Sequence, residues 1–193
     1  MSTAFWIVIA VVAAVTIVAL VAWAYAQSRR RTSLREQFGP EYDRTVDSAK
    51  SRRTAERELE EREKAHERLD IRPLSQAARD RYTADWHRAE QQFVDDPELA
   101  ARQADRIVRG VLEERGYPRD DFDSQVAAVS VDHPHVVDRY RHGHDMVHSN
   151  GAAGQERTEN LRKAMVDFRT IFEQLVEDVE TPAEIEEPAA SLT

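Results

Sequence analysis

The sequence predicts an all-α protein with an N-terminal single transmembrane helix, a charged helical stalk, and a helical bundle of about four to five helices. Three observations predict this fold. An uncharged run covers Ala4–Ala26, apolar residues recur at three- and four-residue intervals in the second half of the chain, and no segment alternates as a strand does. We divide the chain into an anchor (1–28), a juxtamembrane stalk (29–72), a bundle domain (73–179) and a disordered acidic tail (180–193).

The uncharged run is long enough to cross a membrane. Its 23 residues, Ala4–Ala26, make a helix of about 34 Å, and a hydrocarbon core is about 30 Å thick. Arg29, Arg30 and Arg31 follow, and no charged side chain precedes the run. The positive-inside rule therefore predicts a plasma-membrane protein whose N-terminus is outside and whose C-terminal domain is cytoplasmic, with the lipid bilayer as partner of Ala4–Ala26.

A cleaved signal peptide is the alternative, because Ala22-Trp23-Ala24 resembles a small-x-small cleavage site. However, no basic stretch precedes the run, and the run exceeds the usual length of about 7 to 15 residues. Three arginines also stand just after the cleavage-like site. These features favour an anchor.

The predicted stalk is a highly charged helix. After Gly39-Pro40, positive and negative side chains alternate as far as about Asp70, with Glu58 and Glu60 each four residues before a basic partner. Apolar residues are too sparse there for a long coiled-coil seam. We expect a solvated helical stalk rather than a dimerisation zipper.

Five helices are predicted after Arg72-Pro73, where proline ends the stalk. They cover 74–93, 97–115, 120–131, 134–148 and the stretch from the loop 150–154 to Val179. The last is the clearest, because its apolar residues alternate steps of four and three: Leu161, Met165, Phe168, Phe172, Leu175 and Val179. Each helix has one apolar face, which favours burial in a bundle core.

Composition excludes several kinds of function. The formal net charge is −9, and nucleic-acid binding needs clustered positive charge, so we expect no nucleic-acid partner. The chain has no cysteine, which excludes disulfides, thiolate metal sites and cysteine nucleophiles.

A histidine cluster is the one concentration of residues that suggests chemistry. Five of the seven histidines lie between His133 and His148. His144 and His148 are four residues apart, so two imidazoles on one helical face could bind one ion, with His133 as a further ligand. The carboxylates considered as additional ligands are Asp132, Asp145, Asp85, Glu90 and Asp167. The simpler interpretation is a hydrogen-bonded core histidine and solvated neighbours; we therefore predict no cofactor, and keep a divalent metal as the alternative.

The pair His144-Asp145 also occurs in helical metal-dependent phosphohydrolases. Such an enzyme would need His66 or His87 and Asp167 to converge on it, and their spacing gives no support. Nucleophile elbows, phosphate-binding glycine loops and metalloprotease helices have no counterpart in the sequence. The sequence favours a protein that is not an enzyme.

Five stretches carry a resemblance to other proteins: Phe93-Val94-Asp95-Asp96-Pro97, Arg115-Gly116-Tyr117-Pro118, Ser130-Val131-Asp132-His133-Pro134, Tyr140-Arg141 and Thr158-Glu159-Asn160-Leu161-Arg162. Through them the chain, from about Arg72 to Val176, resembles an uncharacterised family of small bacterial, often actinobacterial, membrane-anchored or secreted helical proteins. The resemblance implies no activity. It implies a shared functional surface or core that includes Tyr117, His133, Pro134, Tyr140, Arg141 and His144.

We therefore expect a non-catalytic, single-pass membrane protein whose helical domain acts as an interaction or scaffold module, with a protein partner or a second copy of itself. The alternative is a metal-binding sensor or a metal-dependent hydrolase that uses the cluster His133–His148.

Overall fold

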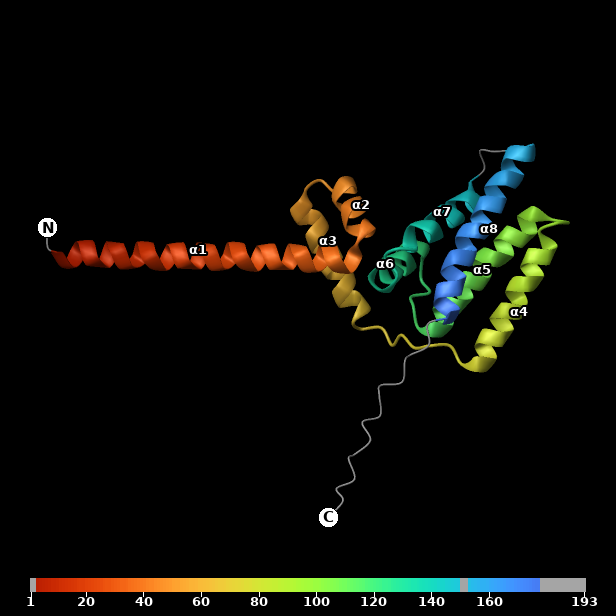
Figure 1. Ribbon diagram of the computed structural model, residues 1–193, viewed down its shortest axis with the longest axis horizontal. Helices are drawn as coiled ribbons and strands as arrows, with labels where there is room; N and C mark the ends of the chain where they lie inside the picture. Colours follow the sequence, from red (N-terminus) through yellow and green to blue (C-terminus); the bar gives the residue numbers. More distant parts are fainter. Residues whose placement is uncertain (1–2, 150–152, 178–193) are drawn as a thin grey trace, which may run out of the picture. The chain divides into compact units, whose positions relative to one another are not determined.

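The computed structural model describes residues 3–149 and 153–177, and the regular elements in these ranges are all helices. The all-α prediction is thereby confirmed. The acidic tail predicted at 180–193 lies outside the described residues. The helices are α1 (Thr3–Phe38), α2 (Pro40–Ser48), α3 (Arg52–His66), α4 (Gln76–Gln92), α5 (Pro97–Arg115), α6 (Phe122–Asp132), α7 (Val137–His148) and α8 (Gly154–Glu177) (Figure 1).

The chain divides into two compact units, which we call unit 1 (Met1–Glu61) and unit 2 (Arg62–Thr193). The boundary falls inside α3, so that helix contributes residues to both. Each unit has its own buried residues and is described separately.

The first helix of unit 1 is apolar over most of its length. The segment Val12–Phe38 is long and apolar enough to cross a membrane, and its most apolar window is not buried against the rest of the protein. The Thr16 hydroxyl donates a hydrogen bond to the Val12 carbonyl oxygen (2.8 Å), so this polar group is satisfied within the helix. By length and composition alone, α1 is a candidate membrane span; an N-terminal signal sequence passes the same test.

Unit 1 differs from the solvated stalk predicted for residues 29–72. Leu34 and Phe38 at the end of α1, Tyr42 in α2, and Ala55 and Leu59 in α3 are all buried. The sequence indicates a break at Gly39-Pro40 and, after it, a charged helix with too few apolar residues to form a buried seam. The chain does turn at Gly39, which has φ of 45°, but it turns again after Ser48, so apolar residues of three helices meet in one small core.

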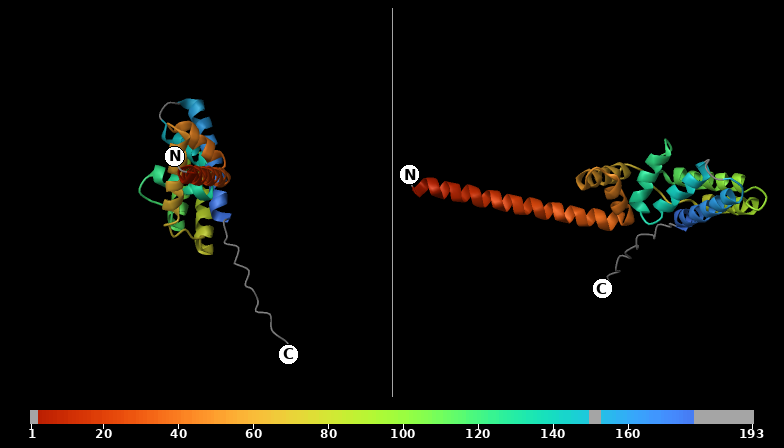
Figure 2. Two further views of the ribbon diagram at one scale, coloured as in Figure 1. Left: turned by 90° about the vertical axis from the view of Figure 1, so that its left-hand side faces the viewer. Right: turned by 90° about the horizontal axis from the view of Figure 1, so that it is seen from above.

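Unit 2 contains one hydrophobic core shared by α4 to α8. Helix α5 packs against both α4 and α8, and α7 packs along α8 (Figures 1 and 2). Tyr140 and Phe168 are fully buried at the α7–α8 contact, and Trp86 of α4 stacks on Phe172 of α8 with ring centroids 4.7 Å apart. Five amphipathic helices thus bury their apolar faces against one another.

The ends of α5 follow the predicted signals. The Asp96 side chain accepts a hydrogen bond from the Leu99 backbone N–H (3.0 Å), and Gly116 ends the helix with φ of 106°. A Cβ atom at position 116 would lie 2.2 Å from the Asp70 carbonyl oxygen, so only glycine fits. The Arg72 N–H also donates to the Arg115 carbonyl oxygen (2.9 Å), which holds the segment before α4 against the end of α5.

Candidate metal centre

A buried carboxylate lies on the inner face of α5. Asp105 is 3% exposed and follows Ala101 and Ala104 on the stripe of positions that α5 turns toward the core. An ionised carboxylate in such a place needs partners, because burying an unpaired charge is costly. The partners come from α7.

Two histidines one turn apart on α7 contact Asp105. His144 Nδ1 lies 3.1 Å from one carboxylate oxygen, and His148 Nε2 lies 3.4 Å from the other. The His144 side chain is 17% exposed and that of His148 is 53% exposed. The cluster therefore has a buried side formed by Asp105 and an open side at His148.

The three groups have the spacing of metal ligands. One ligand atom from each of Asp105, His144 and His148 lies within 4.8 Å of the other two. An ion held tetrahedrally by bonds of about 2.0 to 2.1 Å separates neighbouring ligand atoms by about 3.3 Å. The two nitrogen–oxygen distances, 3.1 and 3.4 Å, are close to that value but run to different oxygens of Asp105, so an ion bound to one oxygen requires the side chains to shift. The donor set of two imidazoles and one carboxylate suits zinc, iron(II) and similar divalent ions.

The two histidines favour the ionised form of Asp105. Burial raises the pKa of this carboxyl, but the hydrogen bonds and charges of His144 and His148 outweigh burial and hold the pKa below its usual value. Asp105 is thus an anion in the folded protein at neutral pH, as a metal ligand must be.

Aromatic residues pack around the inner histidine. The Phe122 ring of α6 stacks on the His144 ring, with centroids 3.7 Å apart and planes 13° from parallel. Tyr140, one turn before His144, donates a hydrogen bond to Gln125 Oε1 (2.7 Å). Burial, and then the negative charge of Asp105, raise the pKa of Tyr140, so it stays a neutral donor. The stacking on Phe122, whose ring also packs against Tyr140, restricts how the His144 ring can turn.

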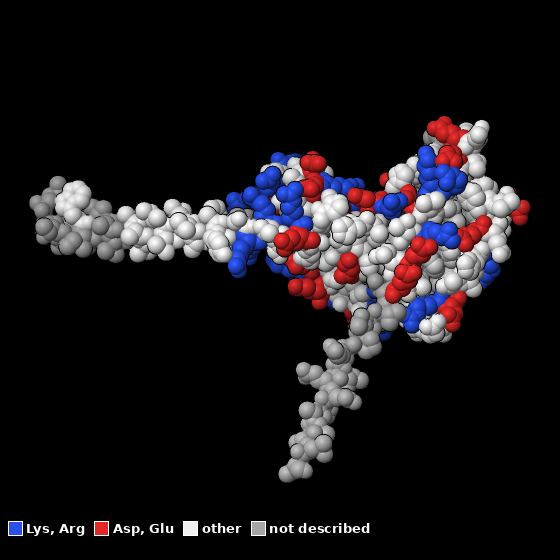
Figure 3. Space-filling view, viewed as in Figure 1, with Lys and Arg blue, Asp and Glu red and all other residues white. Residues whose placement is uncertain are grey.

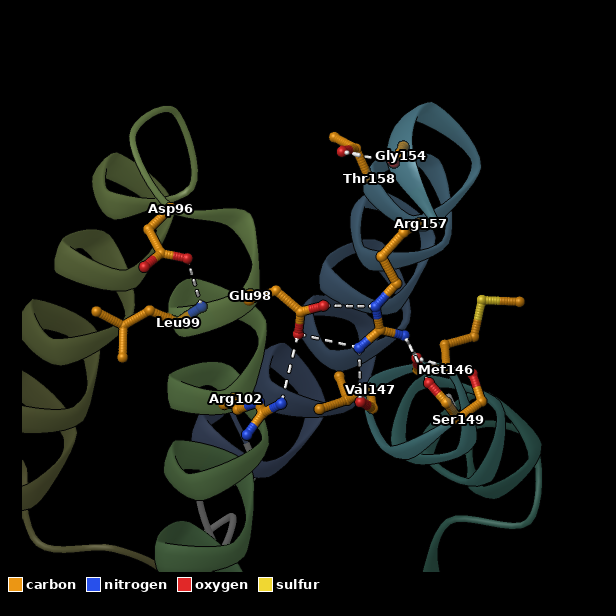
Figure 4. A network of polar contacts seen from close by, with 10 residues as sticks. All are labelled: Asp96, Glu98, Leu99, Arg102, Met146, Val147, Ser149, Gly154, Arg157 and Thr158. Carbon is orange, nitrogen blue, oxygen red and sulfur yellow. Dashed lines mark hydrogen bonds and ion pairs between the residues drawn. The ribbon is translucent and has the colours of Figure 1, made fainter. Parts of the chain in front are cut away.

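A single arginine, Arg157, binds the end of α7 that carries His148. The Arg157 guanidinium of α8 donates to both Glu98 carboxylate oxygens (2.6 and 3.0 Å) and to the carbonyl oxygens of Met146 (2.6 Å), Val147 (2.9 Å) and Ser149 (3.1 Å) (Figure 4). These contacts use its five N–H donors. The carbonyl groups belong to the end of α7 and to its C-cap residue Ser149, where helical N–H partners run out.

This arginine links the two helices that carry the cluster. Glu98 lies seven residues, or about two turns, before Asp105 on α5. The carbonyl groups bound by Arg157 flank His148 on α7. Arg157 therefore fixes the last turn of α7 beside α5.

The remaining predicted ligands lie elsewhere. His133 lines a separate pocket of about 610 Å³ with His66 and Asp132, and the Asp132 carboxylate binds His66 (2.6 Å) and the Tyr117 hydroxyl (2.6 Å). His133 is thus not in the group formed by His144 and His148.

The carboxylates considered on other helices have other partners. Asp85 pairs with Arg88, Glu90 with His87 and Arg169, and Asp167 with Arg139 and His142. The set His66, His87 and Asp167, which a phosphohydrolase would need beside His144-Asp145, is not brought together among these contacts.

The residues expected to share a functional surface are largely internal. Tyr117 and Tyr140 are buried, His133 is 8% exposed, and the Arg141 side chain pairs with Asp138 (2.9 Å). Tyr117, His133 and Tyr140 therefore contribute to packing, whereas Arg141 and His144 are partly exposed.

Asp105 was missed by the sequence reasoning, which considered only the apolar residues of this helix. A signal was present: Asp105 is the one charged residue among the positions 101, 104, 105, 108 and 112, which share one face of the helix. A charge on such a stripe indicates a buried pair.

No family model, curated protein or solved structure matches the chain. The resemblance to the uncharacterised bacterial family remains an expectation.

Proposed function

We propose that this chain is a single-pass membrane-anchored protein whose helical domain binds a divalent transition-metal ion through Asp105, His144 and His148. The observation that supports the proposal is the convergence of one buried carboxylate and two imidazoles from two helices. A metal ion there ties α5 to α7, so binding stabilises their packing. This is the behaviour of a metal sensor rather than of a hydrolase.

Metal analysis of the purified full-length protein tests the proposal. We expect about one equivalent of zinc or cobalt(II), with cobalt giving the visible absorption of a four-coordinate site. Asp105→Asn and His144→Ala should each lose it. His142→Ala is the matched control, because His142 lies on the same helix and contacts Asp167 instead. Binding below a tenth of an equivalent, or unchanged binding in Asp105→Asn, overturns the proposal.

The anchor and its orientation are part of the proposal. The apolar helix α1 supports anchoring, and Arg29, Arg30, Arg31 and Arg35 support a cytoplasmic C-terminal domain in the plasma membrane. Reporter fusions after Thr193 test this. Activity of a cytoplasmic reporter agrees with it, whereas an active alkaline-phosphatase fusion would reverse the orientation or indicate a cleaved signal peptide.

An interaction or scaffold role stays a prediction. Exposed apolar side chains that a partner could cover include Val94 (86% exposed) and Leu99 (40%) near the start of α5 and Val166 (48%) on α8. Cross-linking between differently tagged copies would test self-association.

A further inference from the structure

Two stretches of unit 1 are basic and free of acidic residues. Residues 27–35 contain four arginines, and residues 49–54 contain one lysine and two arginines. The first stretch follows the uncharged part of α1, and the second joins α2 to α3. The seven residues are Arg29, Arg30, Arg31, Arg35, Lys50, Arg52 and Arg53, which we call the basic collar.

The fold of unit 1 brings the two stretches together. Helix α3 lies beside the end of α1, because Arg31 donates to Glu56 (3.1 Å) and Arg30 pairs with Glu60 (3.5 Å). Arg52 is one helical turn before Glu56. In Figure 3 the first coloured side chains after the white stretch of α1 are blue, and they continue over the neighbouring α2 and α3.

The collar residues are accessible to a ligand. All seven are exposed, with the Arg30 and Arg35 side chains 69% and 67% exposed. Arg30 and Arg35 face Glu60 and Asp43 at 3.5 Å, and such exposed ion pairs are weak and screened by salt. A phosphate group can therefore compete for these guanidinium groups.

The first turn of α3 carries positive charge, which is unfavourable at a helix N-terminus. Arg52 and Arg53 occupy its first turn, which has no acidic residue. Basic side chains at a helix N-terminus oppose the helix dipole. Their position therefore favours binding of an anion outside the helix over a role in helix stability.

We propose that the basic collar binds the headgroups of anionic phospholipids and so holds unit 1 against the membrane surface. The proposal rests on the proposed anchoring by α1. Clusters of about four to eight basic residues next to a membrane span suit an anionic leaflet. The small core of unit 1 keeps the second stretch beside the first, which a flexible stalk would not do.

A label at the collar tests the proposal in the full-length protein. The chain has no cysteine, so Ser51→Cys accepts a single fluorophore between Lys50 and Arg52. The labelled protein is placed in nanodiscs of phosphatidylcholine, with or without phosphatidylglycerol, that contain a lipid with a nitroxide headgroup. We expect stronger quenching with phosphatidylglycerol, and weaker quenching at high salt.

Charge variants identify the residues responsible. Lys50→Gln/Arg52→Gln/Arg53→Gln should abolish the preference for anionic discs, since each charge near such a surface changes occupancy about fivefold. Lys50→Arg/Arg52→Lys/Arg53→Lys should retain it. The matched control, Arg57→Gln/Arg62→Gln/Lys64→Gln, removes equal charge from later positions of α3 and should also retain it.

Several results would overturn the inference. One is equal quenching in discs with and without phosphatidylglycerol. Another is an equal loss of the preference for anionic discs in both glutamine variants. A third is an equivalent change in fluorescence when inorganic phosphate is added to phosphatidylcholine discs, which would assign the collar to a free anion. Protein that does not remain in the discs refutes the anchoring instead.

Discussion

At the scale of single residues, two helix glycines differ in what surrounds them. A Cβ atom at Gly143 would lie 3.1 to 3.3 Å from three ring atoms of the buried Phe168, whereas one at Gly110 would meet the hydroxyl end of the partly exposed Tyr82 at 3.3 Å. The Phe168 ring has no room to move because it lies in the α7–α8 contact. The Tyr82 hydroxyl donates to Glu114 (3.0 Å) at the partly exposed end of its ring, where a shift of a few tenths of an ångström is easier.

We predict opposite effects of alanine at these two positions. Gly143→Ala should lower the free energy of unfolding of unit 2 by about 1 to 3 kcal/mol through overpacking. Gly110→Ala should be neutral or should raise it by up to about 1 kcal/mol, because alanine favours a helix interior. Chemical denaturation followed by Trp86 fluorescence, in a Trp6→Phe/Trp23→Phe background, measures both. Equal effects would contradict the difference in packing.

The candidate site shows what can be predicted for individual residues. The i,i+4 spacing of His144 and His148 correctly placed both side chains on one face of one helix. Asp105 could not be assigned to the same site from the sequence. It lies 39 residues before His144, and its contact with the histidines depends on how α5 packs against α7. Sequence spacing describes one helix at a time.

At the scale of helices, the Arg157–Glu98 contact joins α5, α7 and α8. The hydrogen bonds from Arg157 lower the pKa of Glu98 against a smaller opposing effect of burial. A carboxyl whose folded-state pKa is lowered contributes stability above its unfolded pKa, here about 4.5, and loses that contribution as the pH falls through the folded-state value.

We therefore predict that Glu98→Gln is less stable than the wild type at neutral pH, and that the difference disappears in acid. The Glu98 side chain is 44% exposed, so screening limits the expected loss to about 1 kcal/mol. Thermal unfolding between neutral pH and about pH 3 measures it. A difference that persists below the folded-state pKa would show that the ionised contact is not its cause.

Arg157→Lys tests the geometry of the same contact. A lysine keeps the charge but cannot reach Glu98 and three carbonyl groups together, so metal affinity should fall about tenfold through misplacement of His148. Arg162→Lys is the control, because Arg162 pairs only with Glu159 of its own helix among the contacts described. Unchanged metal affinity in Arg157→Lys would remove the link between this contact and His148.

Helix positions in unit 2 could be predicted best where an apolar stripe and marked ends occur together, as in α5 with Asp96 and Gly116. Helix α7 has no side-chain cap and begins at Val137, three residues after the predicted start. Unit 1 could not be predicted in the same way. Its core joins Phe38, Tyr42 and Leu59 from three helices, and apolar residues are too sparse in this charged stretch to indicate which of them meet. The turn at Gly39 could be predicted, whereas the second turn, after Ser48, has no glycine or proline to mark it.

At the scale of the whole molecule, separate cores predict separate responses to mutation. Phe38 is fully buried in unit 1, and Phe168 is fully buried in unit 2. Phe38→Ala should destabilise unit 1 by about 3 to 5 kcal/mol and leave metal binding and Trp86 unfolding unchanged. Phe168→Ala should instead destabilise unit 2, lower the stability reported by Trp86 and weaken metal binding, and it should leave unit 1 unchanged. Hydrogen exchange of residues 34–59 measures unit 1, and a simultaneous loss of protection in both units would show that they unfold together.

The contact at Gly116 gives the chain a path for mechanical load. Two main-chain contacts join the segment before α4 to the end of α5. The Asp70 carbonyl oxygen lies against Gly116, and the Arg72 N–H donates to the Arg115 carbonyl oxygen. Tension applied from the N-terminal side would therefore reach the helical domain at the C-terminal end of α5. The same helix carries Asp105, so a pull on the chain and occupancy of the proposed metal centre would act on one element.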